Sequence, residues 1–244
     1  MRRSHLSPLV LLLLPAVSAP LASQTFVLRR GNDTISVEQA RVRGDTLSAD
    51  GIIGSVRIRT SLTLITDRAR RPTSLRSKMW LTTDSLGAPP RQSAEVTFPG
   101  DSVIVSLDGG GQKTVQRIGS KRGAIPYVNP SIALVELVIA RASAEGNWPA
   151  SIPLFMMAGG QTVDATLSRV GRDTVVVSIA GADMRLSVDA RNRVLGGTIP
   201  SQGIAIDRRD GPTAAFTPDK LDYSAPGGAP YRAIEVVVDR KSVV

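Results

Sequence analysis

The side chains available for chemistry in this chain are carboxylates, hydroxyls and cations, because the chain has no cysteine and its one histidine is His5. His5 lies in an N-terminal segment with the pattern of a signal peptide, so the remaining sequence has neither imidazole nor thiol. This composition excludes a Ser-His-Asp triad, a cysteine nucleophile and the usual zinc, copper and iron sites. We therefore assign no catalytic residue, no metal ligand and no cofactor from the sequence.

Glu136 is the carboxylate of most interest, because it interrupts an otherwise apolar helical segment. Burial raises the pKa of a carboxyl group and can suit it to proton transfer, so a carboxylate-based enzyme using Glu136 is one hypothesis. The pattern favours a structural role, in which Glu136 pairs with an arginine of a surrounding sheet or faces solvent. Four other carboxylates occupy strand positions that we expect to point outward: Glu38, Glu95, Asp164 and Asp189.

Basic residues gather on two segments with strand patterns, residues 55–65 and the segment after Pro72. Alternation predicts that the inward positions are Val56, Ile58, Leu62 and Leu64, followed by Leu75, Met79 and Leu81. If the two strands pair, their outward faces form a basic stripe of Arg57, Arg59, Arg76, Lys78 and Trp80. A solvated sheet face is the favoured interpretation of this stripe, and contact with an anionic ligand is the alternative.

One helix is predicted, over residues 129–146 with the sequence NPSIALVELVIARASAEG. Asn129 is expected to cap it, Pro130 to occupy its first position, and Gly146 to end it in the left-handed conformation. Apolar residues cover most of its circumference and leave only a narrow strip formed by Glu136, Ala140 and Ser143. Such a helix must be covered on several sides, and it is too short to span a bilayer comfortably.

Alternating patterns separated by Gly and Asp turns fill most of the rest of the sequence. The triplet Gly109–Gly111 is predicted to be a hairpin turn, since neither a helix nor a Gly-Lys-Ser/Thr ending follows it as in a phosphate-binding loop. The predicted fold is mainly β (α+β), with a curved antiparallel sheet or half-barrel wrapped around one central apolar helix at about residues 130–145.

The segment that follows the helix, residues 148–157, is apolar and interrupted by prolines. We expect it to pack as core beneath the helix, with a ligand pocket as the alternative. In the pocket hypothesis an apolar or amphiphilic ligand is held between helix and sheet by Trp148, Phe155 and Met157, close to Glu136.

The chain is predicted to have four parts. Residues 1–23 resemble a secretory signal peptide, with Arg2 and Arg3 before an apolar run and small residues before Gln24, so we expect a secreted or periplasmic protein with no transmembrane anchor after cleavage. Residues 24–209 form the β-domain. Residues 210–230 form a Pro/Gly-rich linker, and residues 231–244 read as the truncated start of a further strand or domain.

The net charge of the chain bears on whether it binds nucleic acid. Removing Arg2 and Arg3 from the 30 basic residues leaves 28 against 21 acidic residues, a net charge of +7. The excess is scattered through the strands and has no interleaved aromatic platform, so we expect no nucleic-acid partner.

The pattern of residues 25–208 resembles, in architecture and not by motif, the half-barrel of periplasmic lipoprotein-carrier proteins. The C-terminal sequence YSAPGGAPYRAIEVVV is similar to the connector and first strand that precede the catalytic domain in exported α/β-hydrolases with an N-terminal β-domain. The resemblances imply two functions for a non-catalytic domain. One is a binding or accessory module attached to a C-terminal catalytic domain in the same full-length chain, and the other is a free-standing periplasmic carrier of an apolar or amphiphilic ligand.

Overall fold

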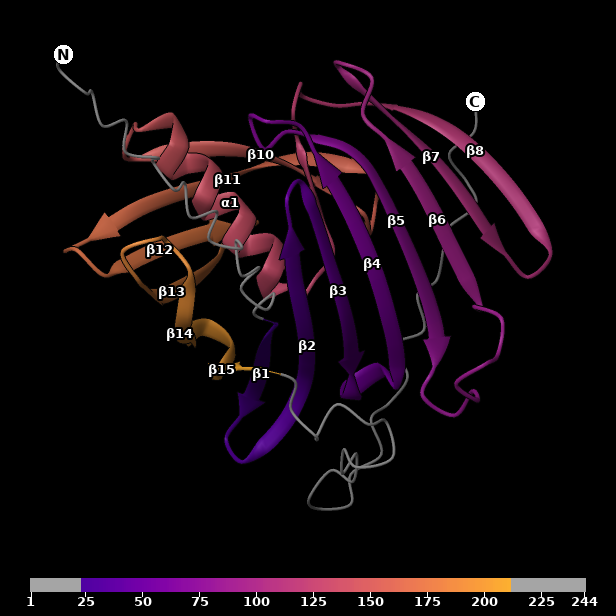
Figure 1. Ribbon diagram of the computed structural model, residues 1–244, viewed down its shortest axis with the longest axis horizontal. Helices are drawn as coiled ribbons and strands as arrows, with labels where there is room; N and C mark the ends of the chain where they lie inside the picture. The colour runs from indigo at the N-terminus through magenta and orange to yellow at the C-terminus, as the bar shows by residue number, and fades with distance from the viewer. Residues whose placement is uncertain (1–22, 212–244) are drawn as a thin grey trace, which may run out of the picture.

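The computed structural model describes residues 23–211, which contain fifteen strands, one α-helix and two short 3-10 turns (Figure 1). The strands are β1 (Gln24–Arg30), β2 (Asp33–Arg43), β3 (Thr46–Ile53), β4 (Ile58–Thr66), β5 (Pro72–Leu81), β6 (Gln92–Thr97), β7 (Ser102–Gly109), β8 (Gln112–Gly119), β9 (Ile125–Tyr127), β10 (Ala150–Met156), β11 (Gln161–Val170), β12 (Thr174–Ile179), β13 (Ala182–Val188), β14 (Val194–Ile199) and β15 (Ile204–Asp210). The helix α1 spans Ile132–Glu145, and the turns η1 and η2 span Gly54–Val56 and Pro200–Gln202. The predicted signal peptide, linker and final strand lie outside the described residues, apart from residues 23, 210 and 211.

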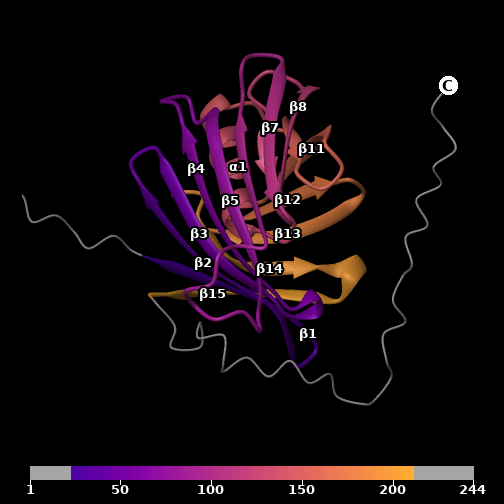
Figure 2. The same ribbon diagram turned by 90° about the vertical axis from the view of Figure 1, so that its right-hand side faces the viewer.

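All fifteen strands belong to one sheet, in the order β8-β7-β6-β5-β4-β3-β2-β1-β15-β14-β13-β12-β11-β10-β9. Two meanders build it, and they meet where β1 pairs with β15 in the middle of the sheet. Every neighbouring pair is antiparallel except β9 and β10, which run parallel. Figures 1 and 2 show the sheet bending toward the side on which α1 lies. The strands β8 and β9 are its edges. The predicted curved, mainly antiparallel sheet is confirmed.

Alternation of apolar and polar residues explains which face of each strand is buried. In β12, Val175, Val177 and Ile179 are buried, and in the paired strand β13 the buried residues Met184 and Leu186 oppose them. A period of two buries one face of an antiparallel pair and leaves the other to solvent. The hairpin predicted at Gly109–Gly111 joins β7 to β8.

The strands β4 and β5 pair as predicted, but the inward face is shorter than expected. Leu64 opposes Leu75, and both are fully buried. Val56 and Leu81, predicted to face the core, are 57% and 41% exposed. Val56 lies in η1 and not in a strand, because the chain turns at Arg57, whose φ of 53° is left-handed. Leu81 is the last residue of β5, at the opposite end of that strand from the buried Leu75.

The helix begins two residues later than predicted. The backbone N–H of Ser131 donates to the carbonyl of Val128 at 2.8 Å, so Asn129 and Pro130 form a turn before the helix and do not belong to it. Ser131 is the N-cap, since its Oγ accepts from the N–H of Leu134 at 3.2 Å. The predicted cap at Asn129 and first position at Pro130 are therefore wrong. Gly146 ends the helix at φ 74°, and its N–H donates to the carbonyl of Ala142, as predicted.

A single hydrophobic core joins the helix to both meanders. The buried helix residues Ile132, Leu134, Val135, Val138 and Ile139 belong to the same cluster as the inward residues of the sheet. The helix contacts β2 from one meander and β9 and β10 from the other. This core brings the ends of many strands around the first turn of α1, where the candidate site lies.

Candidate ligand-binding cavity

A cavity of about 560 Å³ lies beside the N-terminal end of α1. Residues of both meanders and of the turn before the helix line it: Leu28, Arg30, Ile35, Ser36, Ile53, Val56, Ile58, Tyr127, Asn129, Pro130, Met156, Ile179, Ala180, Ala182, Met184, Ile199, Gln202 and Ile204. We call this space the large cavity. Its volume falls within the range of roughly 300–1,000 Å³ typical of small-molecule sites.

The large cavity is apolar at its floor and more polar at its rim. Fourteen of its eighteen lining residues are apolar or aromatic, and the other four are Arg30, Ser36, Asn129 and Gln202. Leu28 and Ile179 are buried, whereas Arg30 and Gln202 are exposed. Leu28 lies within β1 and Ile179 ends β12, whereas Arg30 is the last residue of β1 and Gln202 belongs to the turn η2. Such a surface can bind an apolar body by burying it, at about 25 cal/mol per Å².

Polar groups near the floor are held by the protein itself. The Oγ of Ser36 donates to the carbonyl of Ile52 at 3.1 Å. The hydroxyl of Tyr127 lies 3.5 Å from Oδ1 of Asn129. Burial, together with the nearby carboxylate of Glu38, raises the pKa of Tyr127 to about 12, so this phenol stays neutral at ordinary pH.

Glu38 lies beside this region and is buried, which contradicts the prediction that it points outward. Ser131 Oγ donates to its Oε1 at 2.5 Å, and the N–H of Ala133 donates to its Oε2 at 2.9 Å. The carboxyl group thus satisfies free donors at the positive end of the helix dipole. Burial raises the pKa of Glu38, whereas these hydrogen bonds lower it and the charge of Glu136 adds to the rise. Glu38 faces inward because Ser36, Glu38 and the core residue Ala40 share one face of β2.

Glu136 forms a polar cross-link between the helix and the sheet. Its Oε1 accepts from Nε2 of Gln24 at 3.0 Å, and its Oε2 accepts from the N–H of Val194 at 2.8 Å. Nη1 of Arg208 lies 3.7 Å from the same Oε2 and donates to the carbonyl of Val194 at 2.9 Å. The predicted pairing of Glu136 with a sheet arginine is therefore found, with Arg208 on β15.

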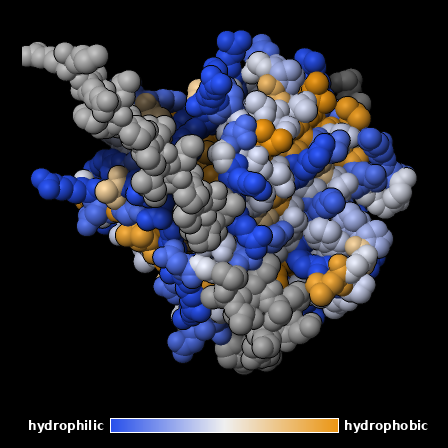
Figure 3. All heavy atoms as spheres, in the orientation of Figure 1, coloured by the Kyte–Doolittle hydropathy of each residue, from blue (hydrophilic) through white to orange (hydrophobic). Residues whose placement is uncertain are grey.

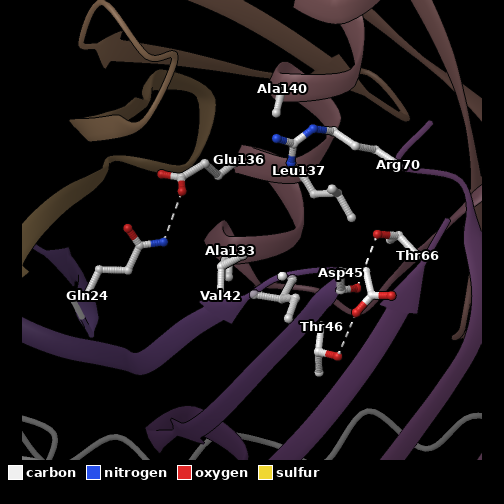
Figure 4. Close-up of a pocket in the computed structure, with 12 residues that line it drawn as sticks. Gln24, Val42, Asp45, Thr46, Thr66, Arg70, Ala133, Glu136, Leu137 and Ala140 are labelled. Atoms are coloured by element: carbon white, nitrogen blue, oxygen red, sulfur yellow. Dashed lines mark hydrogen bonds between the residues drawn. The ribbon is translucent and has the colours of Figure 1, made fainter. Parts of the chain in front are cut away.

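A small pocket of about 70 Å³ lies beside Glu136 (Figure 4). Ala133, Glu136, Leu137 and Ala140 line it from the helix, and Gln24 and Thr66 are among the strand residues opposite. In Figure 4, Arg70 reaches over the helix face that carries Leu137 and Ala140. Glu136 and Ala140 of the predicted strip thus border a hollow, whereas Ser143 does not line it, and the volume of this hollow is far below that of the large cavity.

The structure does not bring the remaining predicted ligand residues into one cavity with Glu136. Phe155 is 1% exposed and belongs to the core, and Met157 packs against that core. The guanidinium of Arg169 lies 4.6 Å above the ring of Trp148 and donates to Ser143, near the other end of the helix. None of these three aromatic or methionine residues lines the large cavity, although the adjacent Met156 does.

The residues of the predicted basic stripe lie on β4, β5 and the turn before them. Arg59 opposes Trp80 across the two strands, and its guanidinium lies 5.2 Å from the ring centroid. Arg76 forms an exposed ion pair with Glu95 at 3.5 Å. Lys78 opposes Ser61, and Arg57 lies in the turn before β4. Figure 3 shows hydrophilic residues interspersed with smaller hydrophobic groups over the visible face.

Two kinds of feature are absent from residues 23–211. No group of three or more His, Cys, Asp or Glu side chains in this part of the chain is arranged to hold a metal ion. Within the same residues no helix has the length and apolarity needed to cross a membrane. The chemistry that the described site offers is therefore burial of apolar surface next to one cationic group, Arg30.

Sequence reasoning missed the large cavity because its lining residues follow the same alternation as residues that fill a core. The sequence pattern predicts ordinary inward positions for Leu28, Ile179 and Ile204, and only the tertiary arrangement leaves space between them. The position of Arg30 in the sequence, by contrast, could have indicated a site. It continues the inward positions of Phe26 and Leu28 in β1, so its charge falls on an apolar face.

Comparison with known proteins identifies no family for this chain. No family model matches it, and no curated protein matches it. One solved structure to which it is similar is that of a DUF1089 family protein from Pseudomonas aeruginosa, with a TM-score of 0.49 and 13% sequence identity. The match covers 67% of this chain and 89% of the other. A likeness of this size assigns neither a family nor a function.

Proposed function

We propose that this protein binds an apolar or amphiphilic small molecule in the large cavity, and that its sheet acts as a half-barrel around α1 for that purpose. The observation that carries the proposal is a space of about 560 Å³ lined by fourteen apolar or aromatic residues among eighteen. The hollow is partly open to solvent beside the start of α1, so a ligand can enter it and bury its apolar part against the lining residues. The signal-peptide pattern of residues 1–23 supports a carrier that works outside the cytoplasm.

The ligand in this proposal is held by shape and burial and not by covalent chemistry. Each buried methylene contributes about 0.8 kcal/mol, so a chain of about eight to ten methylenes contributes about 6–8 kcal/mol, from which the entropic cost of association is subtracted. The polar lining residues lie mainly at the rim, which suits a molecule with one polar end.

The test is binding of a fluorescent long-chain fatty acid to purified residues 24–211, together with native mass spectrometry of the gently purified protein for a co-purified adduct. Ala182→Phe places a ring in the cavity and should weaken binding at least tenfold. Ala205→Phe is the matched control, since Ala205 is exposed on β15 and does not line the cavity. Absence of both an adduct and probe uptake, or equal binding by the two variants, would contradict the proposal.

A second candidate is an accessory domain attached to a catalytic domain of the hydrolase type. The observation that favours it is the hydrogen bond from the N–H of Gly211 to the carbonyl of Ser23 at 2.8 Å, which brings the two ends of the β-domain together. A domain whose ends meet can be joined to another without disturbing its sheet. The coding sequence decides this candidate: a frame that continues past Val238 into a Gly-x-Ser-x-Gly segment supports it, and an early stop codon removes it.

A further inference from the structure

We infer that the molecule bound in the large cavity is an anionic amphiphile, whose aliphatic part occupies the apolar floor and whose carboxylate or phosphate group pairs with Arg30 at the rim. This inference rests on the proposed function, because it names the chemical class of ligand for the same cavity. Three observations on Arg30 carry it: its position on the inward face, the lack of a carboxylate partner for it among residues 23–211, and the distribution of polarity around it.

The position of Arg30 follows from the alternation of β1. Phe26 and Leu28 point into the core, and Arg30 is the next residue on that face. Leu28 and Arg30 both line the large cavity, the first buried and the second exposed. Pairing of Arg30 with Ile204 on β15 fixes this end of the strand beside another lining residue. The guanidinium is therefore presented at the opening of an apolar space and not on the outer face of the sheet.

Among the residues that the structure describes, Arg30 is the one charged residue that lines the large cavity. Within residues 23–211 no carboxylate lies within 4.0 Å of its guanidinium nitrogens, whereas Nε of the neighbouring Arg29 lies 3.7 Å from Asp207 on the opposite face. Arginine presents a planar set of donors that matches carboxylate and phosphate oxygens in pairs. An unpaired arginine at the rim of an apolar cavity thus favours a ligand that carries an oxyanion.

The distribution of polarity selects an amphiphile over a uniformly apolar ligand. Leu28, Tyr127 and Ile179 are buried at the floor, and Ala180 and Gln202 are exposed with Arg30 at the rim. A ligand with one apolar and one charged end leaves its charge near water while it buries its chain. A charge carried further inside would face the full cost of desolvation.

The experiment compares a fluorescent long-chain fatty acid with its methyl ester at a pH where the acid is ionised. The two probes share one chain and differ in charge. We expect the wild-type protein to bind the acid about fivefold more tightly than the ester, a ratio that corresponds to roughly 1 kcal/mol. Arg30→Ala should abolish this preference, so that acid and ester bind with similar affinity, and Arg30→Lys should restore most of it. Arg209→Ala is the control, because it removes an exposed charge from β15 that does not line the cavity.

Each outcome has a defined meaning. Competition between a lysophosphatidic acid and the fluorescent fatty acid tests whether the oxyanion is a phosphate or a carboxylate. If the lysophosphatidic acid displaces the probe more strongly than an unlabelled fatty acid does, the ligand is assigned to the phospholipids. Equal binding of acid and ester by wild type, or equal loss of both in Arg30→Ala, overturns the inference while leaving the proposed function in place. Failure of both probes to bind overturns the two together.

Discussion

At the scale of single residues, Glu38 shows how a charged residue comes to be buried in this fold. Its two carboxyl oxygens accept from Ser131 Oγ and from the N–H of Ala133, groups that would otherwise lack partners at the start of the helix. Burial is nevertheless the dominant influence and raises the pKa of Glu38. The folded protein therefore keeps the Glu38 proton to a higher pH than the unfolded chain does.

This shift predicts a pH dependence of stability. Because the folded-state pKa is raised, the contribution of Glu38 is complete below its ordinary value of 4.5 and is lost as the pH rises through the raised value. Glu38→Gln resembles the protonated group, since its amide can donate to Ser131 and accept from Ala133. We expect the free energy of urea unfolding of wild type to fall relative to that of Glu38→Gln as the pH rises above the ordinary pKa of 4.5.

The matched control for this measurement is Glu95→Gln, because the side chain of Glu95 is 67% exposed. Its stability curve should run parallel to that of wild type across the same pH range. A Glu38→Gln curve that also runs parallel to wild type would show that Glu38 does not change its ionisation with folding.

Glu136 leads to a second prediction at this scale. Its carboxylate and the guanidinium of Arg208 are 14% and 6% exposed, so removal of the acid leaves a nearly buried cation with one fewer partner. We expect Glu136→Ala to lower the free energy of unfolding by about 2–3 kcal/mol, less than for a fully isolated pair because Asp210 lies 3.2 Å from Nε of Arg208.

Glu145→Ala is the control for Glu136, since the Glu145 side chain is 47% exposed on the same helix and its partner Arg141 also donates to the carbonyl of Gly123, so the substitution should cost about 1 kcal/mol or less. Equal effects of the two substitutions on urea unfolding would refute the cross-link. A catalytic role for Glu136 predicts a different result, in which Glu136→Gln keeps its fold and loses turnover of a substrate.

At the scale of elements, the start of α1 depends on a side chain from the sheet as well as on its own cap. Ser131 Oγ accepts from Leu134 N–H and donates to Glu38 on β2, so the first turn of the helix and the strand fix each other. This coupling places the turn residues Asn129 and Pro130 at the wall of the large cavity.

We expect Ser131→Ala to lower the free energy of unfolding by about 1–2 kcal/mol, because it removes the cap and one partner of Glu38. Asn129→Ala should change it by less than about 0.5 kcal/mol, since Asn129 caps nothing. Thermal and urea unfolding of both variants test the assignment. A larger loss in Asn129→Ala would restore the cap that the sequence pattern predicted.

At the scale of the whole molecule, the two meanders share one core through α1 and pair directly at β1 and β15. The opposite edges, β8 and β9, are joined by a short connection in which Nζ of Lys121 lies 2.6 Å from a carboxyl oxygen of Asp164. A shared core of this kind favours cooperative unfolding. The two tryptophans suit a test, because Trp80 lies in the first meander and Trp148 precedes the first long strand of the second.

We expect Trp80→Phe and Trp148→Phe, each keeping one fluorescent reporter, to give the same urea midpoint when fluorescence and far-ultraviolet circular dichroism are compared within each variant. Coincident transitions by different probes indicate two-state behaviour. A midpoint reported by Trp148 that differs from the circular dichroism midpoint would mean that the second meander unfolds separately.

The sequence by itself determined the kind of structure. Its alternating patterns specified the strands, its glycine and aspartate turns specified the hairpins, and the apolar segment up to Gly146 specified the helix and its end, because these signals act between near neighbours in the chain. It also excluded histidine and cysteine chemistry after residue 23.

Tertiary structure alone decided the burial of Glu38, the partner of Glu136 and the existence of the large cavity. Glu38 and Ser131 are 93 residues apart, and Gln24 and Glu136 are 112 apart, so no local pattern relates them. Apolar residues that line an empty volume recur along the sequence with the same period as apolar residues of a filled core. Whether Leu28, Ile179 and Ile204 enclose a void is settled only when the sheet bends and the two meanders meet.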